Sequence, residues 1–181
     1  VRYDPTRFVA ESISEVLRTL FEAMILVFLV VYVFLQDWRT TLIPAVTIPV
    51  SIIASFLVMA ALGFSINVLT LLGLVLAIGL VVDDAIVVLE NIYRRMELGE
   101  PPLIAAVDGS REIGFAVVAT TLVLTAVFVP ISFLQGNVGK LFREFGFTIA
   151  AAVAFSSLVA LTLTPMLCSK LLGGGAQHSR F

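Results

Sequence analysis

From Thr40 to Val82 the sequence contains no Asp, Glu, Lys, Arg or His. A membrane-spanning helix needs about 20 mostly apolar residues, so this run is long enough for two spans joined by a short turn. The whole chain has a similar character, because only 13% of its residues are charged and its mean hydropathy is +1.09. A soluble domain averages about 25% charged residues. The sequence therefore predicts an all-α membrane protein.

Five apolar segments are long enough to cross a membrane, which predicts a bundle of five transmembrane helices. The expected spans are residues 16–36, 43–62, 68–93, 113–133 and 145–170. The expected connections are a lead-in at 1–15 that ends a preceding periplasmic region, a polar connection at 94–112, a turn at 134–144 and a flexible tail at 171–181.

Basic residues in the short connections predict the orientation of these spans. Arg39, Arg94, Arg95, Arg111 and Lys170 fall on one side of the bundle, whereas the connection at 134–144 carries only Lys140 and Arg143. Cytoplasmic loops are enriched in Lys and Arg. The connection at 94–112 is therefore expected to be cytoplasmic and the turn at 134–144 periplasmic.

The third span carries two adjacent carboxylates, Asp83 and Asp84, in an otherwise apolar run. An ionised carboxylate at such depth costs at least about 2.5 kcal/mol. Two neighbours also repel each other, so one of them is expected to take up a proton easily. A proton- or ion-coupling site is the main hypothesis, and a structural pair neutralised by a basic side chain on another helix is the alternative. The nearest arginine in the sequence, Arg94, lies about 15 Å along the helix axis, at the membrane surface.

Helical periodicity divides the third span into two faces about 100° apart. One face carries Gly73, Ala77, Leu80, Asp84 and Asn91, and the other carries Gly79, Asp83 and Glu90. Small residues let helices approach closely in lipid, which predicts helix packing at Gly73, Ala77 and Gly79. The acidic pair is therefore expected to face protein.

Three further residues are accessory candidates for the same site: Glu22, Glu90 and Asn91. Glu22 and Glu90 lie near the ends of their spans, where a side chain reaches the interface, and this structural interpretation is preferred for both. Thr120, Thr121 and Thr125 are candidate hydrogen-bonding neighbours, although threonines in membrane helices usually bond their own backbone.

Several functional classes lack support in this composition. The net charge of −2 gives no indication of a nucleic-acid partner. The single cysteine, Cys168, and the single histidine, His178, provide no disulfide framework and no metal-ligand spacing. No nucleophile–base pattern suggests an enzyme. The sequence therefore predicts no cofactor and no metal, and it leaves protons or another ion as the species that the acidic pair would couple.

The run from Gly79 to Asn91 resembles the fourth transmembrane helix of resistance-nodulation-division (RND) transporters. The signature of that helix is Gly-x-x-x-Asp-Asp, followed by Ala-Ile-Val and Glu-Asn. Four other segments look like the same family: Phe34–Arg39, Gly63–Asn67, Ala126–Pro130 and Leu161–Cys168. The resemblance covers residues 3–172.

The resemblance implies that these residues form helices two to six of a twelve-helix transporter in the bacterial inner membrane. It implies a drug:proton antiporter of the hydrophobe/amphiphile branch, with Asp83 and Asp84 as the proton relay and a lysine from helix ten as their partner. By the same resemblance, the transporter is a homotrimer that works with a periplasmic adaptor and an outer-membrane channel. The alternatives are an RND-related exporter of metal, lipid or protein, or a membrane scaffold without transport activity.

Overall fold

The computed structural model describes residues 5–172, which form five long helices and one short 3-10 helix. In chain order the elements are α1 (Pro5–Leu35), α2 (Trp38–Ala61), α3 (Val68–Glu97), α4 (Pro102–Phe128), η1 (Val129–Phe133) and α5 (Gly136–Leu171). Five helical segments are long and apolar enough to cross a membrane, and the described residues contain no strand. The predicted all-α membrane bundle is confirmed.

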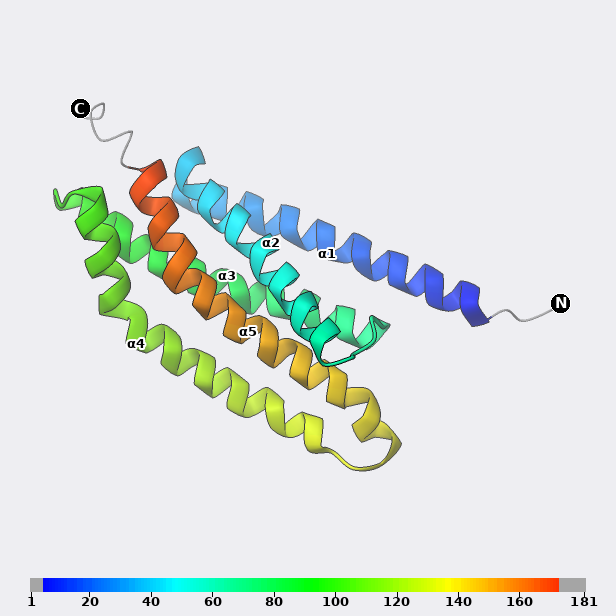
Figure 1. Cartoon of the computed structure of the whole chain (residues 1–181). Helices are drawn as coiled ribbons and strands as arrows, with labels where there is room; N and C mark the ends of the chain where they lie inside the picture. The colour runs from blue at the N-terminus through cyan, green and yellow to red at the C-terminus, as the bar shows by residue number, and fades with distance from the viewer. Residues whose placement is uncertain (1–4, 173–181) are drawn as a thin grey trace.

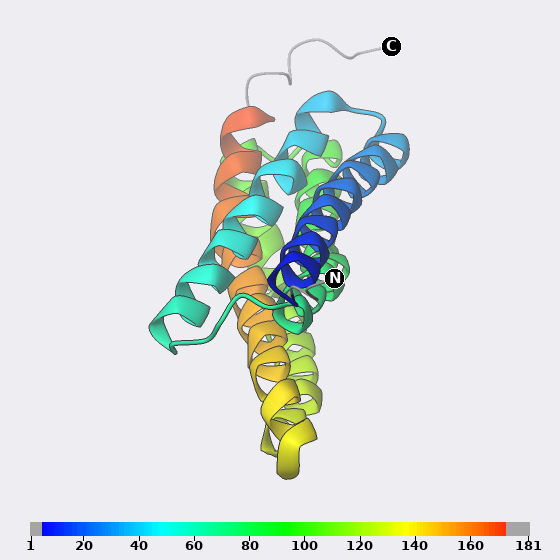
Figure 2. The same cartoon turned by 90° about the vertical axis from the view of Figure 1, so that its right-hand side faces the viewer.

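Helix α5 is the centre of the bundle, because it packs against α2, α3 and α4 (Figure 1). Helix α1 lies at the outside, against α2 and α3 (Figure 2). Two apolar clusters form the core. The first, which includes Val31, Ile52 and Ile78, lies largely among α1, α2 and α3. The second, which includes Val88 and Val117, joins α3, α4 and α5.

Side chains at the turns define where two of the helices begin. Asp37 caps α2 by accepting hydrogen bonds from the backbone N–H groups of Arg39 and Thr40 and from the Thr40 hydroxyl. Partial burial alone would raise the pKa of the Asp37 carboxyl, but these hydrogen bonds and the charge of Arg39 hold that pKa below its usual value. Asn67 and Thr70 form a reciprocal capping box at the start of α3.

The helices extend into three of the expected connections, whose boundaries remain predictions because a helix end does not mark a membrane surface. Helix α1 already begins at Pro5, within the expected lead-in at 1–15. The expected connection at 94–112 is mostly helical, because Pro102 starts α4 and proline fits the first turn of a helix. The expected turn at 134–144 is confined to its first residues, since α5 begins at Gly136. The positions of the membrane surfaces and the sidedness remain predictions, and 173–181 of the expected tail lie outside the described residues.

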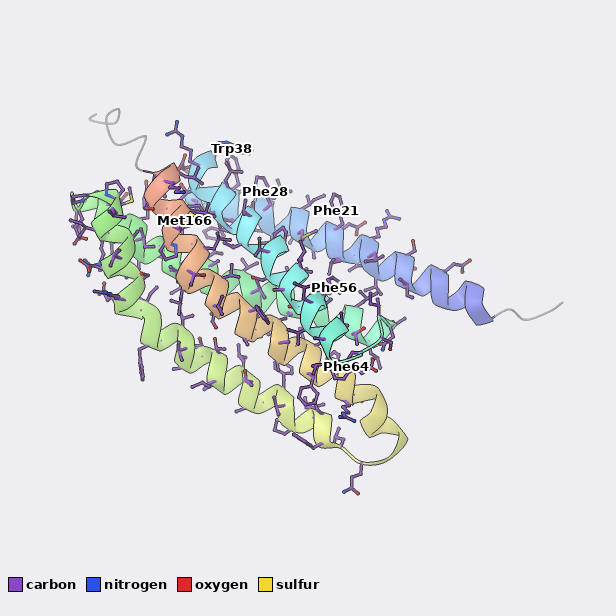
Figure 3. All side chains as sticks on the ribbon, in the orientation of Figure 1. Phe21, Phe28, Trp38, Phe56, Phe64 and Met166 are labelled. Carbon is purple, nitrogen blue, oxygen red and sulfur yellow. The ribbon has the colours of Figure 1, made fainter. Side chains whose placement is uncertain are left out.

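Large apolar side chains cover the outer surface of the bundle rather than its interior alone (Figure 3). Phe21, Phe34 and Phe115 have exposed fractions of 60%, 83% and 86%. Trp38, also exposed, meets Phe28 edge to face with ring centroids 6.3 Å apart. Such a surface is suited to lipid, and a Trp at the end of a span is typical of the membrane interface.

Candidate functional site in the transmembrane bundle

The two carboxylates of the third span have different surroundings on α3. The face of α3 that packs on the bundle carries the buried residues Val81, Ala85 and Val88. Asp84 borders this face and is half-buried, whereas Asp83 is exposed. Among the described residues Asp84 lies against the bundle and Asp83 is exposed, so for Asp83 the expectation remains a prediction.

Ser156 of α5 is a hydrogen-bond partner of Asp84. Its Oγ lies 3.1 Å from Oδ2 of Asp84 and 3.0 Å from the backbone oxygen of Val81. A hydroxyl has one proton to donate, so it can donate to only one of these two acceptors at a time. Ser156 is therefore positioned to respond to whether Asp84 is ionised or neutral.

The sequence interpretation did not identify Ser156, and it considered threonines of α4 instead. Thr120 and Thr121 both donate to the backbone oxygen of Val117, as the structural interpretation of these residues expected. A signal for Ser156 does exist in the sequence. Ala152, Ser156 and Ala160 recur at intervals of four residues, and all three are buried against the bundle.

Of the three residues predicted to pack against a neighbouring helix, two are buried and one is exposed. A Cβ added at Gly73 would lie 3.2 Å from Cδ2 of Phe145 and 3.3 Å from Cγ1 of Ile149, so α3 and α5 touch closely there. Ala77 is 2% exposed and belongs to the first core cluster. Gly79 is exposed and has no neighbour within 4 Å of a built Cβ, so it packs against nothing among the described residues. The reason is that Gly79 shares the outward face of Asp83.

Two of the accessory candidates lie away from Asp84. Glu22 is exposed and pairs with Arg18 of its own helix at 2.9 Å, and its position at the membrane interface remains a prediction. Glu90 is exposed on the same face as Asp83, about 10 Å farther along the axis of α3. Among the described residues, every ion pair lies outside the acidic pair, between Arg18 and Glu22 or at the α3–α4 turn.

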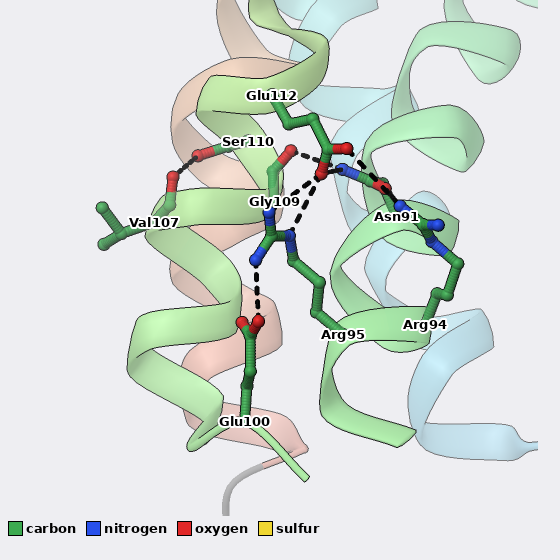
Figure 4. A network of polar contacts seen from close by, with 8 residues as sticks. All are labelled: Asn91, Arg94, Arg95, Glu100, Val107, Gly109, Ser110 and Glu112. Carbon is green, nitrogen blue, oxygen red and sulfur yellow. Dashed lines mark hydrogen bonds and ion pairs between the residues drawn. The ribbon is translucent and has the colours of Figure 1, made fainter. Parts of the chain in front are cut away.

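Asn91, the third candidate, belongs to a separate polar network that ties α3 to α4 (Figure 4). Its amide donates to the backbone oxygen of Gly109 at 2.8 Å and to Glu112 at 3.2 Å. Arg95 donates to Glu112 at 3.0 Å and to Glu100 at 2.8 Å. This network holds the two helices together at the end of α3, so Asn91 has a structural role here.

Within the part of the chain that the structure describes, no three His, Cys, Asp or Glu side chains come together. The acidic pair lies on α3 at the edge of an apolar bundle: Asp84 accepts a hydrogen bond from a serine of a neighbouring helix, and Asp83 faces outward. These features define a multi-pass membrane protein with an intramembrane acidic site.

Comparison with known proteins identifies the family. The model of the AcrB/AcrD/AcrF family matches residues 1–181. The chain is 53% identical over 171 residues to multidrug export protein AcrF of Escherichia coli (strain K12), which covers 94% of this chain and 16% of that protein. It is 50% identical over 180 residues to multidrug resistance protein MdtC of Pectobacterium atrosepticum, covering 99% of this chain and 18% of that protein.

The chain therefore belongs to the AcrB/AcrD/AcrF family of RND multidrug efflux transporters. The resemblance in the sequence is confirmed. The chain spans less than a fifth of the length of these relatives.

Proposed function

We propose that this chain forms part of the membrane domain of a proton-driven multidrug exporter and that Asp83 and Asp84 are its proton relay. The observation that carries the proposal is the hydrogen bond from Ser156 of α5 to Asp84 of α3, inside an apolar bundle. Intramembrane carboxylates are costly and are typical of proton pathways. The relatives, a multidrug export protein and a multidrug resistance protein, support drug export as the process that the protons drive.

The geometry suggests how protonation changes the contact between α3 and α5. When Asp84 is ionised, the Ser156 hydroxyl donates to the carboxylate. When Asp84 is protonated, its own O–H can donate to Ser156 Oγ, and the serine proton is then free for the Val81 oxygen, 3.0 Å away. The proton therefore reverses the direction of one hydrogen bond across this interface. A bound proton can shift a conformational equilibrium only through such a difference between states.

Asp83 has the complementary role in this proposal. It faces away from the five helices, on a stripe of α3 that also carries Gly79 and Glu90. A basic side chain from another part of the transporter would meet Asp83 there. Gly79 lies one helical turn before Asp83, and its lack of a side chain leaves room for another helix to pack closely. The rest of the proposed assembly follows the family resemblance: a homotrimer in the bacterial inner membrane, with a periplasmic adaptor and an outer-membrane channel.

The test uses the full-length transporter in proteoliposomes that carry a pH gradient and a fluorescent dye substrate. We expect gradient-driven dye movement in the wild type and none in the double variant Asp83→Asn/Asp84→Asn. Asn is close to isosteric with a neutral Asp, so the variant should insert and reach the same abundance. Dye movement at the wild-type rate in this variant would exclude the relay. No dye movement in the wild type, with gradient-driven transport of a metal, lipid or protein instead, would favour one of the alternative exporters.

A further inference from the structure

Glu144, in the third turn of α5, ties this helix to the turn that precedes α3. Its Oε2 accepts a hydrogen bond from Nδ2 of Asn67 at 2.7 Å and another from Oγ of Ser65 at 3.0 Å. Carboxylate oxygens accept stronger hydrogen bonds than neutral oxygens do. The contact lies about 18 Å along α5 from Ser156, at a rise of about 1.5 Å per residue. It is therefore a second polar attachment between the same two parts of the bundle that meet at Asp84.

Asn67 carries this attachment directly to the first turn of α3. Its Oδ1 accepts a hydrogen bond from the backbone N–H of Thr70 at 3.0 Å, and the Thr70 hydroxyl accepts one from the backbone N–H of Asn67 at 2.9 Å. Thr70 is completely buried. This reciprocal cap holds Asn67 in a fixed place on α3. A contact made by the Asn67 side chain consequently fixes the start of the helix and not only a surface loop.

The part of α5 around Glu144 is packed on two sides. A Cβ added at Gly146 would lie 2.8 Å from the backbone oxygen of Phe128, the last residue of α4. A Cβ added at Gly73 of α3 would lie 3.3 Å from Cγ1 of Ile149. Protein interiors packed this closely transmit displacements instead of absorbing them. Glu144 therefore joins α3 to a well-supported segment of α5.

Helices α3 and α5 run side by side in the same direction. Their paired residues advance together along both helices: Asn67 with Glu144, Gly73 with Ile149, and Asp84 with Ser156. Apolar packing is non-directional, so it opposes separation of the two helices more than axial sliding. Hydrogen bonds depend steeply on distance and angle. The axial position of α3 on α5 is consequently set by the polar contacts at Glu144 and Ser156.

We propose that Glu144 is a positioning residue for the proton relay, which fixes the axial position of α3 so that the Ser156 hydroxyl stays opposite Asp84. An axial shift of about 1.5 Å, the rise of one residue, would lengthen and misalign the 3.1 Å contact between Ser156 and Asp84. Glu144 acts as a hydrogen-bond acceptor and carries no proton in transport. The inference rests on the proposed function, because the position of Asp84 affects transport only if Asp84 belongs to the relay.

The experiment measures dye movement by the full-length transporter in proteoliposomes with a fixed pH gradient, at equal abundance. Glu144→Ala should lower the maximal rate by up to about tenfold, the effect of losing the hydrogen bond to Asp84, and leave the half-saturating dye concentration unchanged. Glu144→Gln keeps an oxygen acceptor and should retain the wild-type rate. Ser65→Ala removes one of the two donors and should cause a smaller loss. The matched control is Glu97→Ala, which removes an exposed glutamate at the opposite end of α3 and should leave the rate unchanged.

A double variant separates positioning from a general structural role. If Glu144 acts through the contact of Ser156 with Asp84, Glu144→Ala should cause no further loss in a Ser156→Ala background. Losses that multiply in the double variant would overturn the proposal, and so would a wild-type rate in Glu144→Ala. Equal losses in Glu144→Gln and Glu144→Ala would also overturn it, because they would assign the effect to the charge or the proton. If Glu144→Ala fails to fold, Ser65→Ala repeats the test in both backgrounds.

Failure of the proposed function would be visible separately from failure of this inference. Dye movement at the wild-type rate in Asp83→Asn/Asp84→Asn would exclude the relay itself. A relay that is confirmed by that variant, together with multiplying losses at Glu144 and Ser156, would reject only the positioning role.

Discussion

The inward and outward faces of α3 differ more than their neighbouring positions in the sequence suggest. The inward face carries Gly73, Ala77 and, at its border, Asp84, and it meets α5 at van der Waals distance. The outward face carries Asp83, which is exposed, and Gly79, which has no neighbour within 4 Å of a built Cβ among the described residues. Two residues of the same type, one position apart, therefore experience different surroundings. The comparison teaches that a helix can hold one carboxylate within its own bundle and offer the other to a different partner.

The largest expected effect is the loss of either carboxylate. In the full-length transporter, Asp84→Asn and Asp83→Asn should each reduce gradient-driven dye transport by about 100-fold or more, as expected for removing a group that carries the proton. Asp84→Asn should leave the α3–α5 contact intact, because an amide can still hydrogen-bond with Ser156. The measurement is the initial rate of dye movement per transporter, with abundance quantified in the same vesicles. Efflux near the wild-type rate in one variant would remove that residue from the relay and leave its neighbour as the only coupling group.

The second-largest effect is expected on stability, when a large side chain is introduced on the inward or the outward face of α3. Gly73→Leu should destabilise the protein by about 1–3 kcal/mol, because the new side chain overlaps Phe145 and Ile149. The matched variant on the outward face, Gly79→Leu, should leave the packing of these five helices unchanged. Thermal unfolding of the isolated 181-residue segment in detergent gives both values. Equal destabilisation by the two variants would contradict the assignment of a packed and an open face.

A smaller effect is expected from the serine that holds Asp84. Ser156→Ala should slow transport about tenfold at a fixed gradient, because it removes a hydrogen bond to a charged group. Ser157→Ala is the matched control, since that hydroxyl bonds to the backbone oxygen of Ala154 in its own helix. Rates are compared at equal abundance. Equal rates for Ser156→Ala and Ser157→Ala would mean that the α3–α5 hydrogen bond has no part in coupling.

The sequence predicted the helical bundle well because long apolar runs have few alternatives in lipid. The division of α3 into two faces was also predictable, since helical periodicity groups Gly73, Ala77 and Asp84 apart from Gly79 and Asp83. Periodicity does not indicate which neighbour covers a face, so the open surroundings of Gly79 came only from the structure. Ser156 was missed for the same reason. It lies 72 residues from Asp84 in the chain, and only the crossing of α5 over α3 brings the two together.

The smallest effect is expected two turns farther along α3, where Asn91 and Glu90 again place neighbouring residues on the inward and outward faces. Asn91 donates to the backbone oxygen of Gly109 in α4, whereas Glu90 is exposed on the face of Asp83. Asn91→Ala should lower the stability of the same segment by about 1 kcal/mol, because it leaves a helix–helix hydrogen bond unmade. The loss should be no larger, since Arg95 and Glu112 still link the two helices. Glu90→Gln should leave the melting temperature unchanged. Equal destabilisation by Glu90→Gln and Asn91→Ala would show that the outward face of α3 contributes to the stability of these helices. The assignment of a packed and an open face would then be wrong for the C-terminal part of α3.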